Sequence, residues 1–359
     1  MKITMQSLTL VAVTLLFAQT ICAQRDAASK QYHEWWNDQN IGAPLNSPDA
    51  KKLPLLHVRG NKFVDDRGDT ILFRGLSISD PDKIEHQGHW SKDHFVKVKE
   101  MGTMLVRIPV HPIAWRERTP TKYLALLDQA IQWCTELGMY VIIDWHSIGN
   151  LKMELFQDPM YNTTKTETYE FWRTIARHFK GNNTAAFYEI FNEPTLYRGE
   201  LGTMSWSEWK KINEDIIKLI RAYDPERIPL VAGFDWAYDL TPLNFEPIEA
   251  EGIAYVTHPY PHKRSKPYEP KWEEDFGFAA GSYPIIATEI GFTLGKEGMK
   301  DNGEYGRAIV NYLEGKGISW VAWVFDPEWY PRMFESWDTY KLTETGEFFK
   351  QAMQGKVKK

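Results

Sequence analysis

Short apolar runs alternate with longer amphipathic segments along most of this 359-residue chain, and this alternation limits its fold more than any other feature. The short runs are rich in β-branched and aromatic residues and lie between turn residues, which is typical of strands buried on both faces. The longer segments, such as residues 122–138, 166–181 and 206–224, repeat their apolar residues at helical spacing. Eight runs have the strand pattern: residues 71–76, 103–110, 140–146, 186–192, 228–234, 252–258, 284–290 and 318–325.

Eight strands that alternate with helices predict an α/β fold, a closed (β/α)8 TIM barrel. Ahead of the first barrel strand, residues 56–75 alternate apolar and polar residues around turn signals at residues 60–61 and 66–68, which predicts a short N-terminal β-hairpin. No repeat or low-complexity linker interrupts the series. Residues 55–359 are therefore predicted to form a single (β/α)8 catalytic domain.

The first residues carry a targeting pattern. Residues 1–23 have a lysine near the start, an apolar core and a small residue at the end, which predicts a signal peptide and a secreted or periplasmic protein. Cys22 lies in this segment, so its removal would leave Cys134 as the single cysteine, and no intramolecular disulfide is expected. Residues 24–54 are polar and predict an irregular N-terminal arm, in which Trp35 and Trp36 stand out as anchors.

Composition narrows the classes of partner. The formal net charge is −6 and the basic residues form no stripe, so nucleic acid binding is not expected. No membrane association is expected after removal of the signal peptide, because no later window is apolar enough for a membrane-spanning helix. The protein is expected to be a monomer. Fifteen tryptophans supply flat amphipathic rings, which suit both a core and a platform for ligands with apolar faces.

Polar side chains close most of the predicted strands, and in a barrel they converge at one mouth, where barrel enzymes hold their chemistry. Glu193 and Glu289 each close an apolar run, and two such carboxylates predict an acid and a nucleophile. A buried Glu289 needs a hydrogen-bond donor, for which Arg107 or Tyr260 is expected. Further candidates at the strand ends are Asp144, His146, Asn192, His258 and Trp323.

The histidines also allow a metal site to be considered. The pairs Asp144 with His146 and His86 with His89 lack further ligands at recognisable spacing, so hydrogen-bonding roles are favoured and no metal or other cofactor is predicted. A metal-dependent barrel hydrolase built on His146, His258 and an acid stays open as an alternative, which a chelator would distinguish.

These residues also carry a resemblance to a known family. The motifs are RIPV with Arg107, DWH with His146, FNEP with Asn192 and Glu193, HPY with His258 and Tyr260, TEIG with Glu289, and Trp323 in SWVAW, and together they resemble the active-site set of glycoside hydrolase family 5. The resemblance runs from about residue 60 to residue 349. It implies a retaining β-glycosidase with Glu193 as acid/base and Glu289 as nucleophile. It also implies Asn192 at the sugar 2-hydroxyl.

The substrate implied by this resemblance is a β-linked glucan or mannan polysaccharide. An endo-β-1,4-glucanase (cellulase) is the leading interpretation, because aromatic platforms suit a long polymer with flat faces. An endo-β-mannanase, or a glucanase for mixed-linkage glucan or xyloglucan, would use the same residues, and a non-catalytic carbohydrate-binding barrel is a more distant alternative. Among aromatic residues near strand ends, Trp236 and Trp329 are favoured as platforms, while Trp115, Trp145 and Tyr330 suit either a platform or the core.

Overall fold

In the computed structural model, which describes residues 52–294 and 303–357, eight parallel strands close into a barrel. The strands follow one another around the barrel in chain order, as a series of strand–helix units requires. The predicted fold class is confirmed. The barrel strands are β4 (Arg74–Ile78), β5 (Leu105–Val110), β6 (Tyr140–Trp145), β9 (Ala185–Glu189), β11 (Ile228–Ala232), β12 (Ala254–Val256), β13 (Ile285–Ile290) and β14 (Ser319–Phe325).

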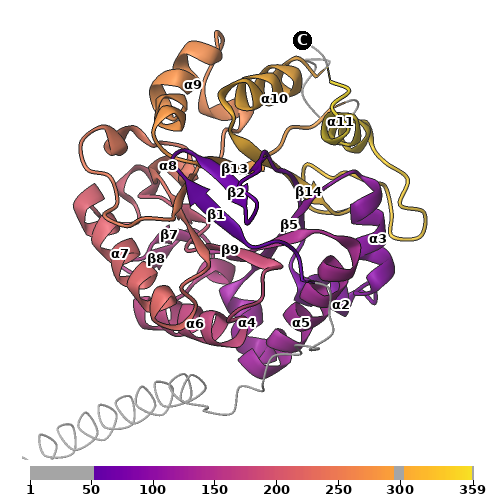
Figure 1. Cartoon of the computed structure of the whole chain (residues 1–359), viewed down its shortest axis with the longest axis horizontal. Coiled ribbons are helices and arrows are strands. Elements are labelled where there is room, and N and C mark those ends of the chain that lie inside the picture. Colours follow the sequence, from indigo (N-terminus) through magenta and orange to yellow (C-terminus); the bar gives the residue numbers. More distant parts are fainter. Residues whose placement is uncertain (1–51, 295–302, 358–359) are drawn as a thin grey trace, which may run out of the picture. The chain divides into compact units, whose positions relative to one another are not determined.

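Helices form a ring around the strands (Figure 1). Among the described residues, the two longest helices are α5 (Pro120–Leu137) and α7 (Trp206–Tyr223). Helix α5 ends at Gly138, whose φ of 67° is the left-handed conformation that glycine adopts without steric penalty. The other helices are α2 (Pro81–His86), α3 (Lys92–Glu100), α4 (Pro112–Arg118), α6 (Lys165–His178), α8 (Phe234–Ala237), α9 (Glu269–Asp275), α10 (Glu304–Lys316) and α11 (Glu344–Met353), with short 3₁₀ turns η2 (Pro159–Tyr161), η3 (Tyr197–Gly199), η4 (Thr241–Asn244), η5 (Pro261–Lys263) and η6 (Gly277–Gly281).

The N-terminal hairpin is present, and the structure extends it. Strands β1 (Leu56–Arg59) and β2 (Lys62–Asp65) pair antiparallel, and β3 (Thr70–Ile71) adds a third strand to β2. Ile71 lies opposite Phe63 of β2, so it belongs to this small sheet, and the first barrel strand begins at Arg74 rather than at residue 71.

The small sheet packs against the amino-terminal end of the barrel. Its Phe63 ring lies 6.0 Å from the ring of Phe73 and 5.2 Å from that of Phe187. All three side chains are buried, and in Figure 1 β1 and β2 lie across the middle of the ring of strands. Apolar side chains therefore fill this end of the barrel.

The inner side chains change character along the barrel axis. Leu105 and Phe187 belong to the apolar core at the amino-terminal end. Two residues further along the same strands, and so on the same face, lie Arg107 and Glu189. The same change occurs in three other segments, where apolar Ile142, Val256 and Ile286 are followed two positions later by polar Asp144, His258 and Thr288. The carboxyl ends of the strands therefore enclose a buried layer of polar and charged groups.

Two sequence predictions lie partly or wholly outside the described residues. The signal peptide (residues 1–23) and all but the last residues of the arm (residues 24–54), including Trp35 and Trp36, belong to the part that is not described. Within residues 52–294 and 303–357, every helix is too short or too polar to cross a membrane.

Candidate active site

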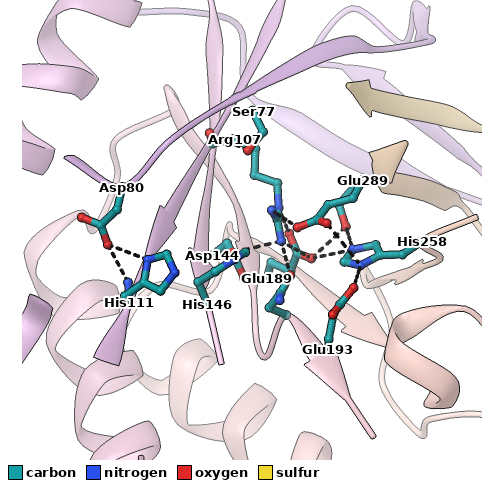
Figure 2. A network of polar contacts seen from close by, with 12 residues as sticks. Ser77, Asp80, Arg107, His111, Asp144, His146, Glu189, Glu193, His258 and Glu289 are labelled. Atoms are coloured by element: carbon teal, nitrogen blue, oxygen red, sulfur yellow. Dashed lines mark hydrogen bonds and ion pairs between the residues drawn. The ribbon is translucent and has the colours of Figure 1, made fainter. Parts of the chain in front are cut away.

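Arg107 of β5 is the centre of the buried polar layer (Figure 2). Its guanidinium donates to both oxygens of Glu189, with distances of 2.7 Å from Nε and 3.1 Å from Nη2, and to Glu289 Oε1 at 2.7 Å from Nη1. Nη2 also lies 2.9 Å from Asp144 Oδ2 and donates to Asn192 Oδ1 at 2.7 Å. A planar guanidinium with five N–H groups can hold these partners in fixed directions. One cation therefore aligns residues from β6, β9, the segment after β9, and β13.

Glu289, near the end of β13, accepts hydrogen bonds from the two donors that the sequence suggested. Arg107 holds Oε1, and the Tyr260 hydroxyl donates to Oε2 at 2.7 Å. Burial raises the pKa of Glu289, while the positive charges of His258 and Arg107 oppose that rise. The ionised form of this buried carboxylate depends on these neighbours.

A second small sheet fixes the backbone of Glu193. Strand β10 (Glu193–Pro194) pairs in parallel with β7 (Ile148–Asn150), which pairs with β8 (Leu155–Phe156). The Glu193 amide donates to the Ser147 carbonyl at 3.1 Å. The side chain of Glu193 is 12% exposed, more than that of Glu289 at 5%, so it has the readier access to solvent.

His258 lies between the two glutamates (Figure 2). Its Nδ1 is 2.9 Å from Glu193 Oε1 and 3.9 Å from Glu289 Oε2. Its Nε2 is 2.9 Å from the hydroxyl of Thr288, which donates to Glu189 at 2.8 Å. Burial lowers the pKa of His258, but the surrounding carboxylates outweigh burial and raise it to about 9.

His146 and Trp323 form an adjoining wall. The two rings are parallel, with centroids 5.3 Å apart. His146 Nδ1 is 2.6 Å from Asp144 Oδ2, and burial together with nearby positive charge lowers the pKa of His146 well below its usual value. A neutral imidazole and a broad indole face suit hydroxyl and C–H contacts with a sugar.

An open cleft of about 980 Å³ runs over this site. It is lined by both glutamates and by Asn192, His146, Tyr260 and Trp323 among the predicted residues. Trp236 lies farther along, where its Nε1 donates to Gln157 at 2.8 Å and Lys263 Nζ lies 4.6 Å from its ring centroid. Tyr330, 60% exposed, also lines the cleft.

The remaining aromatic and histidine candidates have other positions. Trp329 stacks against Trp323, with centroids 6.0 Å apart, and so supports that residue. Trp115 and Trp145 are fully buried, so they belong to the core and cannot be platforms. His89 stacks on Trp337 at 4.7 Å.

Sequence reasoning missed two buried residues of the site. Glu189 is the bidentate partner of Arg107, and Thr288 lies between Glu189 and His258. The two-residue period of a strand could have indicated both residues, because each lies two positions after an apolar core residue and so on the same inner face of its strand. A single glutamate inside an apolar run gives no indication of its partner.

Comparison with known proteins assigns the chain to a family. Residues 64–328 match the cellulase family, glycosyl hydrolase family 5. The chain belongs to glycoside hydrolase family 5. An endoglucanase from Thermobifida fusca is 25% identical to this family 5 chain over 301 residues, which are 79% of this chain and 58% of that enzyme. The family 5 chain thus spans a little over half the length of this curated relative.

Solved structures agree with this assignment. A β-glucanase from Saccharophagus degradans is 44% identical to this family 5 chain, with a TM-score of 0.86 over 90% of this chain and 99% of that protein. The same β-glucanase in complex with cellotetraose is 43% identical, with a TM-score of 0.85 over 91% of this chain and 100% of that protein.

The two carboxylates of this family 5 site, with His258, also have the spacing of a cation site. Glu193, His258 and Glu289 each offer one ligand atom, and these atoms lie within 4.8 Å of one another. However, His258 Nδ1 is hydrogen-bonded to Glu193, and a metal ion would have to replace that hydrogen bond. The absence of a metal remains a prediction, which a chelator tests.

Arg107→Met is expected to lower the free energy of unfolding of this family 5 barrel by about 3–5 kcal/mol, because it leaves three buried carboxylates without their shared cation. The matched control is Arg74→Met. The Arg74 side chain is 31% exposed and pairs with Glu314 at 2.7 Å, so its loss is expected to lower stability by about 1 kcal/mol or less. Urea unfolding of both variants measures the difference, and equal losses would contradict the prediction.

Proposed function

We propose that this chain is a secreted retaining glycoside hydrolase, an endo-β-1,4-glucanase with Glu193 as acid/base and Glu289 as nucleophile. The spacing of the two carboxyl groups carries the proposal, since each offers an oxygen within 4.8 Å of the other. A retaining enzyme needs a separation of about 5–5.5 Å, whereas an inverting enzyme leaves about 6.5–9.5 Å for a water molecule. The signal-peptide pattern of residues 1–23 supports export.

In the first chemical step, a Glu289 oxygen bonds to the anomeric carbon while the bond to the leaving oxygen breaks. The leaving oxygen takes a proton from Glu193, which shares a hydrogen bond with His258. Arg107 and Tyr260 hold Glu289 in place for attack. The product of this step is a glycosyl ester of Glu289.

In the second step, water cleaves the ester. Esterification has removed the charge of Glu289, so Glu193 is no longer beside an anion there and can accept a proton from the water. The water attacks from the face that the leaving group occupied, so the anomeric configuration is retained.

Asn192 suits the sugar 2-hydroxyl. Its Oδ1 accepts from Arg107, which leaves the Nδ2 amide as the group free to donate toward the cleft that Asn192 lines. A hydrogen bond to the 2-hydroxyl that strengthens in the transition state raises turnover rather than binding alone.

The cleft supports a polymeric substrate with flat faces. Trp323 lies beside the catalytic pair, while Trp236 and Tyr330 lie elsewhere along the same open cleft. Aromatic rings at successive positions can stack on successive sugar rings. The relative whose structure contains cellotetraose supports a β-1,4-linked glucose chain.

The test is a panel of soluble polymers, namely carboxymethyl cellulose, barley glucan, glucomannan, galactomannan and xyloglucan. Hydrolysis of carboxymethyl cellulose and barley glucan is expected, and proton NMR should show the β anomer as the initial product. The rate should be the same with and without a chelator. Activity on none of the polymers would contradict the hydrolase proposal, an initial α anomer would contradict retention, and loss of activity with the chelator would favour a metal-dependent mechanism.

A further inference from the structure

Thr288 connects the acid/base pair to the buried charge network. Its side chain is fully buried on β13, next to Glu289 in sequence. The hydroxyl has a single proton, which it donates to Glu189 Oε1 at 2.8 Å. Glu189 is a fixed acceptor, because Arg107 donates to both of its oxygens. Although burial raises the pKa of Glu189, Arg107 and His258 lower it to about 2.

This donation determines which nitrogen of His258 carries a proton. Because the Thr288 hydroxyl gives its proton to Glu189, it can only accept from His258 Nε2, 2.9 Å away. Nε2 is therefore an N–H group. The variable proton of the imidazole lies on Nδ1, and Nδ1 contacts Glu193. His258 and Glu193 thus share one proton across a hydrogen bond of 2.9 Å.

We propose that Thr288 is a positioning residue that sets the tautomer of His258 and thereby keeps a transferable proton on the His258–Glu193 pair. The inference rests on the proposed function of Glu193 as the general acid. With Nε2 held as a donor, a neutral His258 offers only a lone pair at Nδ1, which favours a protonated Glu193. If His258 is doubly protonated instead, the same proton lies on Nδ1 and reaches the leaving oxygen through Glu193.

The carboxylates around His258 act in the same direction. Glu193 of β10, Glu189 of β9 and Glu289 of β13 lie 2.9, 3.7 and 3.9 Å from its ring nitrogens. The negative charges of Glu189 and Glu289 favour the pair that holds the shared proton, which is neutral overall, over the pair without it, which is negative. Arg107 and His146 face it from β5 and the end of β6, and Arg107 is already paired with carboxylates. Removal of the Thr288 hydroxyl leaves a buried N–H without its acceptor, so the pair should lose its proton at a lower pH.

The experiment compares pH profiles of kcat/KM for two substrates. Cellotetraose has a leaving oxygen that needs the acid, and 2,4-dinitrophenyl β-cellobioside has one that does not. For Thr288→Val, the alkaline limb for cellotetraose is expected to move to lower pH by about one unit, because a hydrogen bond to a charged group is lost. Its kcat/KM for the dinitrophenyl substrate should stay close to that of the wild type, because the first step on that substrate does not need the acid.

Two controls isolate the hydroxyl. Thr288→Ser keeps the hydroxyl and should show the alkaline limb of the wild type. Thr288→Ala lacks the hydroxyl and should behave as the valine variant does. The serine and alanine variants provide the comparison if the valine variant fails to fold. Thr103→Val removes another buried hydroxyl, one that donates to backbone carbonyls, and should leave the limb in place.

The outcomes separate this inference from the proposed function. Wild-type inactivity on both substrates would contradict the proposed function itself. An active wild type with an unshifted limb in Thr288→Val or Thr288→Ala, or an equal loss on both substrates, would overturn the role of Thr288 alone.

Discussion

Glu289→Gln is expected to reduce turnover of a soluble β-glucan by about 10⁴-fold or more, because the amide cannot form the glycosyl ester on which the double displacement depends. The amide has nearly the same shape as the carboxylate: its oxygen can still accept from Arg107, and its NH2 group can donate to the Tyr260 hydroxyl. The fold should therefore persist. The expected loss lies in kcat rather than in substrate affinity.

The measurement combines steady-state kinetics with trapping of the intermediate. Mass spectrometry of the wild type treated with a 2-deoxy-2-fluoro cellobioside should identify a peptide labelled at Glu289. The matched control is Glu335→Gln, since Glu335 pairs with Lys341 at the surface and should not affect kcat. Near-normal turnover by Glu289→Gln, or a label on another residue, would remove Glu289 from the nucleophile role.

Glu193→Gln is expected to show a loss that depends on the leaving group. For cellotetraose, kcat/KM should fall by about 10²–10⁴-fold, the usual contribution of a positioned general acid. For 2,4-dinitrophenyl β-cellobioside, kcat/KM should change little, because that leaving group departs without a proton. Deglycosylation loses its base in this variant, so kcat on the activated substrate should become limited by ester hydrolysis.

Azide provides the check on this assignment. A small anion can enter the space beside residue 193 and attack the ester without base assistance, so azide should raise kcat on the activated substrate and yield the β-glycosyl azide. Equal losses on both substrates, without acceleration by azide, would contradict the role of Glu193 as acid/base.

The strands and their ends were predictable because a parallel barrel buries each strand on both faces. Only apolar side chains tolerate that environment without partners, so the eight runs stand out, and the polar residues that close them are exceptions that need an explanation. Glu193 and Glu289 could be placed at one mouth for this reason. The third strand of the N-terminal sheet was missed, because two residues are too short for any periodic pattern.

The contribution of the aromatic residues could not be predicted. Trp115 and Trp145 lie near strand ends, as Trp236 does, yet both are fully buried. A tryptophan near a strand end can point inward to the core or outward to the cleft, and its surroundings decide which. Those surroundings come from helices and loops that are distant in the sequence.

The sequence by itself determined the barrel, the two carboxylates and most of the polar residues at the mouth, because each depends on local pattern and strand order. Only the tertiary structure decided the pairing of those residues. Arg107 contacts Glu189 and Glu289, which are 82 and 182 positions away in the chain. Closure of the barrel brings such groups within hydrogen-bond distance. In a buried layer, the charge of a group and the position of its proton depend on those contacts. The proton shared by Glu193 and His258 therefore depends on Thr288.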